Sequence, residues 1–250
     1  MASPKDMCTG LLVVMTTTTT EHAALPSATL LRLIWLASPA LPVGGFSYSE
    51  GLEPAVECGL VTDEATAMSW LRDQAALCLG RSELPLLGAS WQAWTDIDED
   101  RVRSLNDWVL MTRDGHEARQ QTVQMGRSMA LWLRDDWVGD ARWKFLSALP
   151  EAPTWPVSWA LAAVLAQAPL QESLLAFGFS WAENMVQAAL KSVPLGQRGG
   201  QRILAALADD LPALVQGAVN CSDQDRQVFA PMLAILAAQH ETQYSRLFRS

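Results

Sequence analysis

The chain has 250 residues, half of them hydrophobic and 18% charged, and its formal net charge is −9 at pH 7. This length and apolar content suffice for the core of one large domain, whereas the acidic balance argues against a track for nucleic-acid phosphates. A chain so poor in charge also often hides apolar surface in an oligomer.

The chain contains four cysteines: Cys8, Cys58, Cys78 and Cys221. No two of them form a CxxC pair, and this usage is typical of free thiols in a reducing compartment. The apolar run GLLVVM at residues 10–15 is followed at once by five threonines, so it is shorter than a signal-peptide core or a membrane span. We therefore expect a cytoplasmic protein that does not cross a membrane.

The first part of the chain divides into an extension and a helical region. Residues 1–28 have no helical or strand period, which predicts a disordered extension before one domain over residues 29–250. A short apolar helix is expected over residues 30–36, and SPALPVGGF after it demands a shaped loop. Apolar residues then recur at helical spacing from Phe46 to Leu60, a segment that Pro54 either starts or kinks.

Helical periodicity continues through the rest of the chain. Asp63 caps a helix that we expect to end near Gly80. Further helices are expected over residues 83–94, 117–133, 142–149, 156–168, 170–191, 201–217 and 223–243. Another helix is expected to follow the acidic run that starts at Asp96 and to end by Arg113. Pro212 predicts a kink, and Pro231 either bends the last helix or opens it. No alternating run of strand length follows the extension, so we predict an all-α, single-domain bundle of roughly nine or ten helices without internal repeats.

A narrow polar stripe distinguishes the longest of these helices. It consists of Ser180, Asn184, Gln187 and Lys191. At about 100° per residue these four side chains fall within roughly 60° of one another, and apolar residues cover most of the remaining surface. Pro194 must end the helix, so the Lys191 cation is held beside a defined bend. The stripe is either a solvated face or a strip that meets a partner.

No catalytic or metal-binding motif is complete. His240-Glu241 begins a zincin-like motif, but Tyr244 stands where its second histidine is required. GxSxG is absent, and no GK[ST] follows LPVGG, so the sequence has neither a nucleophile elbow nor a phosphate loop. With three histidines in the chain, we expect no stable metal site. The residues alone indicate a helical interaction protein, although the sequence does not exclude a pair of catalytic carboxylates.

Four separated segments together resemble a known family. They are LASPALPVGGFSYSEGLE at 36–53, TRDGHEARQQTVQMGRSM at 112–129, GFSWAENMVQAALKSVPLGQRGGQ at 178–201 and HETQYSRLFRS at 240–250. In order, spacing and chain length they are similar to the urease accessory protein F family from about residue 30 onward. The preceding residues are not covered.

The resemblance implies an all-α, non-enzymatic protein of the cytoplasm that helps to load nickel into urease. It implies a homodimer that binds the accessory protein D/H, recruits the GTPase G and docks on apo-urease, with nickel released on GTP hydrolysis. The protein would regulate that GTPase or form part of a passage for the ion. No stably bound cofactor is expected because nickel is in transit, and neither nucleic acid nor membrane is an expected partner.

The carboxyl-terminal tail, residues 242–250, is amphipathic and is expected to fray unless it docks in a partner's groove. The resemblance favours docking on D/H, with Tyr244, Leu247 and Phe248 as anchors and the two arginines on carboxylates.

Lys191 matches the lysine of the family's K-x-V-P-x-G-Q turn. We expect it to contact the GTPase rather than act on the nucleotide, because lysine, unlike arginine, cannot bind a phosphate group with two parallel hydrogen bonds. If the LPVGG loop packs on this turn, Glu50 and Glu53 lie on the same surface. The partner-binding residues expected from this interpretation are Glu50, Glu53, Gln187, Lys191, Pro194, Gly196, Gln197, Tyr244, Arg246, Leu247, Phe248 and Arg249.

One segment departs from the family pattern. In place of a more charged R-E-T-R-E-x-R-E run, this chain has RDGHEARQ, which keeps Arg113, Glu117 and Arg119 but inserts Gly115 and His116. A glycine costs about 1 kcal/mol of helix stability relative to alanine, so the helix is expected to split there. His116 is then either a surface histidine or a transient contact on the nickel route.

Two other classes of function compete with this interpretation. A helical enzyme with an unrecognised site would need convergent titratable groups in a pocket. A scaffold protein unrelated to nickel would share the fold but would not support urease maturation.

Overall fold

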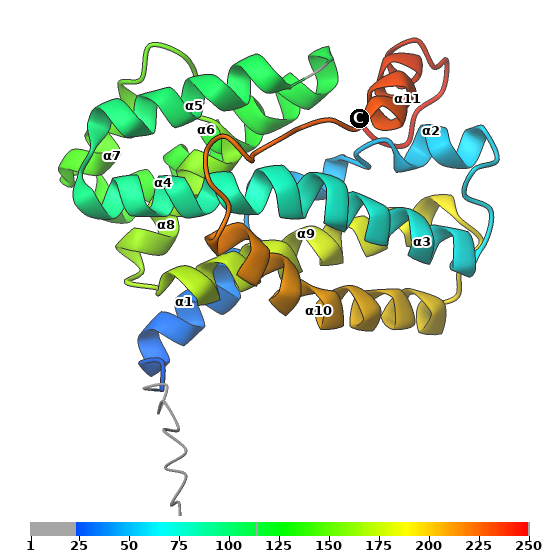
Figure 1. Cartoon of the computed structure of the whole chain (residues 1–250), viewed down its shortest axis with the longest axis horizontal. Coiled ribbons are helices and arrows are strands. Elements are labelled where there is room, and N and C mark those ends of the chain that lie inside the picture. Colours follow the sequence, from blue (N-terminus) through cyan, green and yellow to red (C-terminus); the bar gives the residue numbers. More distant parts are fainter. Residues whose placement is uncertain (1–23, 114, 250) are drawn as a thin grey trace, which may run out of the picture.

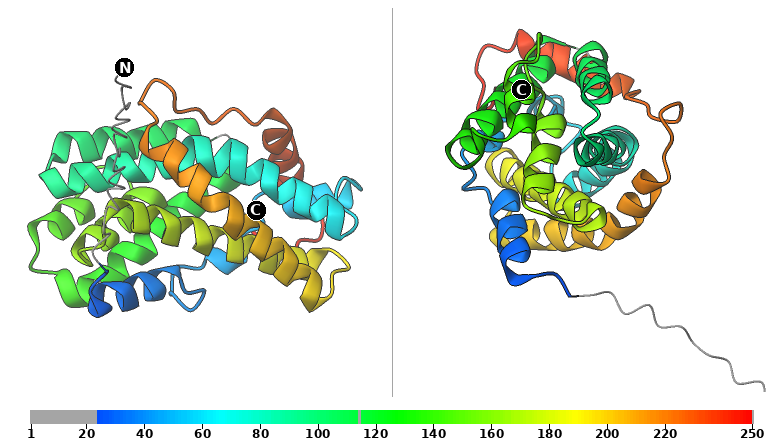
Figure 2. Two further views of the ribbon diagram at one scale, coloured as in Figure 1. Left: turned by 60° about the horizontal axis from the view of Figure 1, so that its bottom comes forward. Right: turned by 90° about the vertical axis from the view of Figure 1, so that its left-hand side faces the viewer.

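The computed structural model describes residues 24–113 and 115–249. Its helices are α1 (Ser27–Ala37), the 3-10 turn η1 (Gly45–Ser47), α2 (Leu52–Glu57), α3 (Glu64–Gln74), η2 (Ala75–Glu83), α4 (Leu84–Asp96), α5 (Glu99–Thr112), α6 (His116–Trp137), α7 (Ala141–Ser147), α8 (Trp155–Leu165), α9 (Leu170–Ser192), α10 (Gln197–Val219) and α11 (Pro231–Glu241). Figures 1 and 2 show them gathered into one bundle. The described residues contain no strand, and the all-α prediction is confirmed.

The two helices expected on either side of Gly80 form one unbroken run from Glu64 to Asp96. Its middle part, η2, has wider π-type turns instead of a break. A Cβ added at Gly80 would lie 3.0 Å from Leu214 Cδ2, so the glycine allows α10 to approach closely and does not end a helix. With this run and each α-helix counted once, the described residues contain ten helices, in agreement with the predicted nine or ten.

Two expected helices also differ in their bounds. Residues 46–60 form only η1 and α2, with Pro54 in the first turn of α2. Pro231 opens α11, because the residue before a proline is disfavoured in the helical region, and Ala230 accordingly has a non-helical backbone (φ −137°, ψ 73°). The last helix is therefore shorter than predicted, and residues 220–230 form a loop.

At the amino-terminal end α1 begins at Ser27, so the last two residues assigned to the extension are helical. Residues 1–23 of the predicted extension lie outside the described residues. None of the described helices is both long and apolar enough to span a bilayer.

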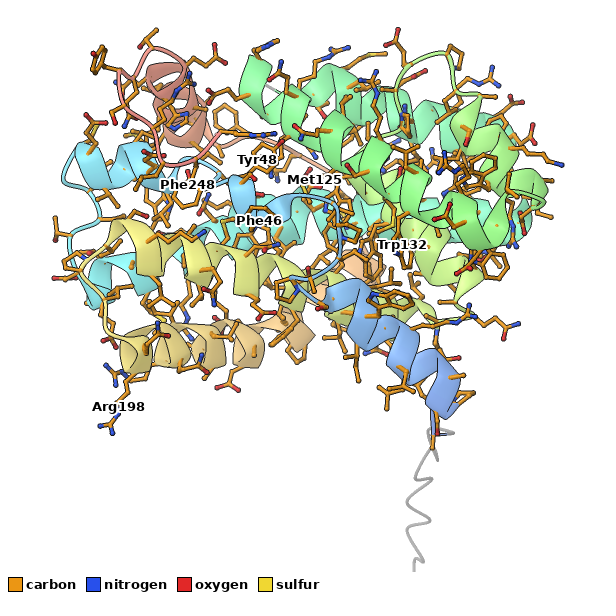
Figure 3. The ribbon with its side chains drawn as sticks, turned by 180° about the vertical axis from the view of Figure 1, so that it is seen from behind. Phe46, Tyr48, Met125, Trp132, Arg198 and Phe248 are labelled. Carbon is orange, nitrogen blue, oxygen red and sulfur yellow. The ribbon has the colours of Figure 1, made fainter. Side chains whose placement is uncertain are left out.

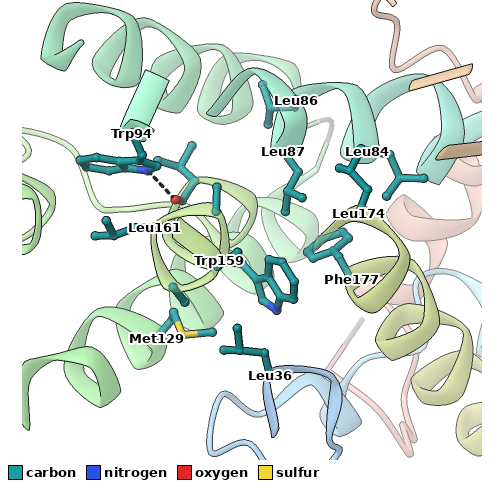
Figure 4. Close-up of a cluster of buried hydrophobic side chains, with 14 of the residues drawn as sticks. Leu36, Leu84, Leu86, Leu87, Trp94, Met129, Trp159, Leu161, Leu174 and Phe177 are labelled. Atoms are coloured by element: carbon teal, nitrogen blue, oxygen red, sulfur yellow. Dashed lines mark hydrogen bonds between the residues drawn. The ribbon is translucent and has the colours of Figure 1, made fainter. Parts of the chain in front are cut away.

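The larger core cluster is built around tryptophan and leucine side chains of α4, α6 and α8 (Figure 4). Trp94 is 1% exposed and donates its indole N–H to the Val157 carbonyl oxygen at 2.9 Å. Trp159 packs edge-on against Phe177 with ring centroids 5.4 Å apart. Most of the tryptophans thus act as core pieces, as their size and single donor predict.

Helix α9 joins the two core clusters of the bundle. Its first half gives Leu174 and Phe177 to the larger cluster, and its second half gives Met185 and Val186 to a smaller cluster shared with α2, α3 and α10. Since α9 also packs on α1, α2, α4 and α10, its remaining polar stripe has a fixed position. The candidate site develops along that stripe.

Candidate functional site

The carboxyl-terminal tail is docked on its own chain. Phe248 is 6% exposed and belongs to the smaller core cluster, and the Arg249 backbone N–H donates to the Ser47 carbonyl oxygen at 2.8 Å. Figure 3 shows Phe248 near Tyr48, while Arg198 lies at the amino-terminal end of α10. The expectation that the tail frays without a partner is therefore wrong for the described residues, because burial of Phe248 holds it.

Glu53 of α2 is the acceptor for the tail backbone. Its carboxylate accepts hydrogen bonds from the backbone N–H groups of Leu247, at 2.7 Å, and Phe248, at 3.0 Å. The side chain is 8% exposed, so both N–H groups and the carboxylate are removed from water together. A buried polar group without a partner costs free energy, and here donors and acceptor satisfy one another.

His240, at the end of α11, lies between two carboxylates. Its Nε2 is 3.3 Å from Glu53 Oε2, and its Nδ1 is 2.7 Å from Glu117 Oε2. Glu117 also accepts a hydrogen bond from Arg246 of the tail at 2.6 Å. These groups tie α2, α6, α11 and the tail together through charged hydrogen bonds.

The Glu241 side chain caps the amino-terminal end of α6. Its Oε1 accepts a hydrogen bond from the His116 backbone N–H at 2.9 Å, where a carboxylate is favoured by the helix dipole. Gly115, with φ 93°, separates α5 from α6, so the helix is split at the predicted glycine. His116 is exposed, and no three His, Cys, Asp or Glu side chains of the described residues are arranged to hold a metal ion. A transient nickel contact at His116 stays a prediction.

Two large side chains of the tail point outward and one points inward. Tyr244 is fully exposed and Leu247 is 70% exposed, whereas Phe248 points into the core. Arg246 and Arg249 face the chain itself, on Glu117 and on the Gln124 side chain. Of the five tail residues expected to meet a partner, the two large apolar side chains are thus the ones left free to do so.

The Lys191 turn adjoins the docked tail. Lys191 Nζ lies 5.5 Å from the centroid of the Phe248 ring, a cation–π contact, and the lysine is exposed to solvent. The other expected residues of this turn, Gln187, Pro194, Gly196 and Gln197, are also exposed. We call the exposed residues Gln187, Lys191, Pro194, Gly196, Gln197, Tyr244 and Leu247 the tail-and-turn surface.

Glu50 and Glu53 do not share that surface. The LPVGG loop packs on α9 at Asn184, two turns before Lys191, where a Cβ on Gly45 would be 3.0 Å from Asn184 Nδ2. Glu53 lies beneath the tail, and Glu50 lines a partly open cavity. The expected placement on the Lys191 turn is corrected, because left-handed backbone at Glu50 (φ 50°) and Gly51 (φ 82°) directs the chain inward.

Sequence reasoning missed the residues that receive the tail. His240 and Glu117 were noted for other reasons, and Gln124, which accepts hydrogen bonds from both Tyr48 and Arg249, was not singled out. The adjacent pair His240-Glu241 was the available signal, since two polar side chains near the end of an apolar helix need buried or capping partners. Their partners are more than 120 residues away in the chain.

The carboxyl group of Glu50 accepts hydrogen bonds from the Trp181 indole, at 2.9 Å, and from the Gln121 amide, at 2.8 Å. Burial raises its pKa above the ordinary value, and these two hydrogen bonds oppose the rise. A raised pKa in the folded state means that the contribution of Glu50 to stability is greatest below the pKa of the unfolded chain and is lost as pH rises through the folded value.

We therefore expect Glu50→Gln to gain stability relative to the parent chain between pH 4 and pH 7. The gain is about 1.4 kcal/mol for each unit by which the folded pKa exceeds the unfolded one. Urea unfolding at several pH values measures it, with Glu57→Gln on the exposed face of α2 as the matched control. The expectation would be contradicted if the free energy of unfolding changed with pH in the same way for the parent chain and for Glu50→Gln.

The fold and the site together define an all-helical protein with a self-docked tail and an exposed turn beside it. The UreF family model matches residues 61–208. The urease accessory protein UreF of Methylibium petroleiphilum is 60% identical over 228 residues, which cover 90% of this chain and 95% of the relative. That of Paracidovorax citrulli is 58% identical over 230 residues, covering 90% of this chain and 91% of the relative.

A bifunctional urease accessory protein UreEF of Bordetella bronchiseptica is 40% identical over 252 residues, covering 99% of this chain and 58% of that longer relative. The chain belongs to the UreF family of urease accessory proteins, whose members take part in urease maturation. The resemblance noted in the sequence is confirmed.

Proposed function

We propose that this chain is a non-enzymatic co-chaperone that promotes GTP-dependent insertion of nickel into urease. It acts by binding the accessory protein D/H, the GTPase G and apo-urease, as a homodimer in the cytoplasm. The observation that carries the proposal is the tail-and-turn surface. Its exposed side chains Tyr244 and Leu247 belong to a tail whose backbone is hydrogen-bonded to Glu53. Membership of the UreF family supports the same role.

The tail supports the contact with D/H. Tyr244 and Leu247 present apolar area to solvent, while the hydrogen bonds to Glu53 already order the backbone between and around them. A preordered segment loses less conformational entropy on binding, which favours affinity. Tyrosine is also among the residue types enriched at binding hot spots.

The Lys191 turn supports the contact with the GTPase. Its lysine is exposed beside a proline-terminated helix end, so its cation is presented at a fixed place. A positive charge there suits an acidic patch on a partner and speeds encounter as well as fixing orientation. We assign it contact with the GTPase rather than an action on the transferred phosphoryl group.

Exposed apolar residues of α1 support self-association. Leu31 is 66% exposed, Ile34 58% and Trp35 52%, and patches of this kind on a protein surface are typical of interaction sites. Nickel is the cargo of the assembly, and the chain is assigned no resident cofactor.

A rival enzymatic function could use Cys78, the one cysteine among the residues that line the cavity, as a nucleophile. Burial, assisted by the nearby charges of Glu50 and Glu83, raises the pKa of its thiol to about 11. Only a small fraction is thiolate at neutral pH, and the thiolate is the reactive form. This argues against thiol catalysis at Cys78 and favours the binding function.

Co-expression with a urease operon that lacks its own F protein tests the proposal. We expect this chain to restore urease activity in a nickel-dependent manner, with a Lys191→Ala, Tyr244→Ala, Leu247→Ala triple variant as the folded negative control. A chain that folds, accumulates and yet restores no activity is the behaviour of a scaffold unrelated to nickel, and that result would sink the proposal.

A further inference from the structure

A partly open cavity of ≈ 190 Å³ lies between α6, α9, η2 and α11. Helix α11 forms one wall with Leu233, Ala234 and Ala237, and the neighbouring loop adds Val228. A cavity of about 150 Å³ is large enough to hold benzene, so this one has room for a small organic molecule.

The cavity lining is mainly apolar and includes three aromatic side chains. They are Trp155, Phe177 and Trp181. Trp155 and Phe177 pack on one another with ring centroids 6.0 Å apart, so their positions are mutually fixed. Aromatic faces carry negative partial charge and attract cations, most strongly where water is excluded.

One carboxyl group of the lining forms no ion pair among the described residues, although the charge of Arg113 also acts on it. Glu83 is paired with Arg113, which neutralises both. Glu50 receives only neutral donors, the Trp181 indole and the Gln121 amide, and among the described residues it forms no ion pair. Each carboxylate oxygen has two acceptor sites, so both oxygens of Glu50 can accept a further hydrogen bond.

The electrostatics of the cavity have the sign that this arrangement predicts. Besides burial, the charges of Glu50 and Glu83 raise the pKa of Cys78, and Arg113 opposes them only as the smallest of the four causes. A second negative charge is therefore disfavoured in the cavity, and a positive one is favoured.

We propose that this cavity is a binding site for a small organic cation, whose apolar body packs on Trp155 and Phe177 and whose ammonium group donates to Glu50. The site goes beyond the proposed function, since no contact of the tail-and-turn surface contributes to it. No three metal-ligating side chains gather among the described residues, and the lining is predominantly apolar, so the complement is an amine with a hydrocarbon body.

Benzylammonium is the probe for the test, with benzyl alcohol as its neutral analogue and benzoate as its anionic one. Isothermal titration of the full chain should show saturable binding of benzylammonium, at least about tenfold tighter than benzyl alcohol, because the ion pair with Glu50 forms in a poorly solvated site. Benzoate should not bind.

Two variants locate the binding. Glu50→Gln should weaken benzylammonium binding at least about tenfold and leave benzyl alcohol unaffected, while Glu57→Gln on the surface should change neither. Ala234→Leu, which adds volume from α11 without touching a polar group, should abolish binding of both. This second variant keeps the test decisive if Glu50→Gln folds poorly.

Equal affinity for benzylammonium and benzyl alcohol would overturn the proposal, as would binding that survives Ala234→Leu. A chain that binds none of the three probes, or that is stabilised by NiCl₂ and by no amine, would also overturn it. The function in urease maturation would stand in each of these cases, because its test does not involve the cavity.

Discussion

Replacing Tyr244 and Leu247 together by alanine is expected to weaken capture of the D/H accessory protein by at least about 30-fold, the loss of one hot spot of about 2 kcal/mol. Stability should not change, since Tyr244 is fully exposed and Leu247 is 70% exposed in the free chain. A pull-down with purified D/H protein, combined with a thermal unfolding curve of each variant, measures both quantities.

The matched control is the double variant Leu131→Ala, Val138→Ala. These residues are 59% and 54% exposed, and they lie in the carboxyl-terminal half of α6 and directly after it, next to α7, which Figure 1 shows at the opposite end of the molecule from the carboxyl terminus. The control should retain capture of D/H, because its apolar loss is similar but its place on the surface differs. Full capture by the Tyr244 and Leu247 variant would remove the exposed half of the tail from the interface.

The docked tail explains why this pair is preferable to deleting the tail. Deletion would also remove Phe248 from the core and would take two backbone donors away from the Glu53 carboxylate. A buried carboxylate left without donors is destabilising by itself. The double variant keeps these contacts and so separates the partner contact from the stability of the fold.

Lys191→Ala is expected to lower urease activation at limiting nickel by roughly fivefold to thirtyfold, the effect of losing a charged contact worth about 1–2 kcal/mol at an interface. Capture of D/H should remain, because Lys191 contributes only an exposed cation–π contact to Phe248. Urease activity in co-expressing cells, measured against nickel concentration, tests the prediction.

Two further variants separate the external contact from the internal one. Lys191→Arg keeps both the charge and the stacking on Phe248 and should activate urease normally. Phe248→Leu keeps an apolar side chain in the core but removes the aromatic ring, so activation should persist if Lys191 acts on the GTPase. Normal activation by Lys191→Ala would exclude the turn from the proposed role.

The parts of the site that are local in sequence were predictable. Pro194 ends α9 close to the expected residue, and Lys191 is exposed beside it, because backbone restriction at a proline acts over one or two residues. The split at Gly115 follows for the same kind of reason, since its φ of 93° is one that side-chain-bearing residues rarely adopt.

The burial of Glu50 and Glu53 was not predictable from such patterns. Glu53 meets the Leu247 backbone N–H across 194 residues, and Glu50 meets Trp181 across 131. Helical periodicity assigns a carboxylate to a face of its own helix but gives no information on which distant donors reach it. Gly80 likewise suggested a helix end, whereas its role is to admit Leu214 of α10.

The sequence by itself determined that the chain is all-α, where most helices lie, that the lysine bend after α9 is exposed, and to which family the chain belongs. These properties follow from apolar periodicity, prolines, glycines and short motifs, which act over a few residues. Only the tertiary structure decided that the tail docks on its own chain, that Glu53, Glu117 and His240 receive it, and that Glu50 faces a cavity. Such contacts arise when segments more than 100 residues apart satisfy each other's buried polar groups, and a local pattern carries no record of that pairing.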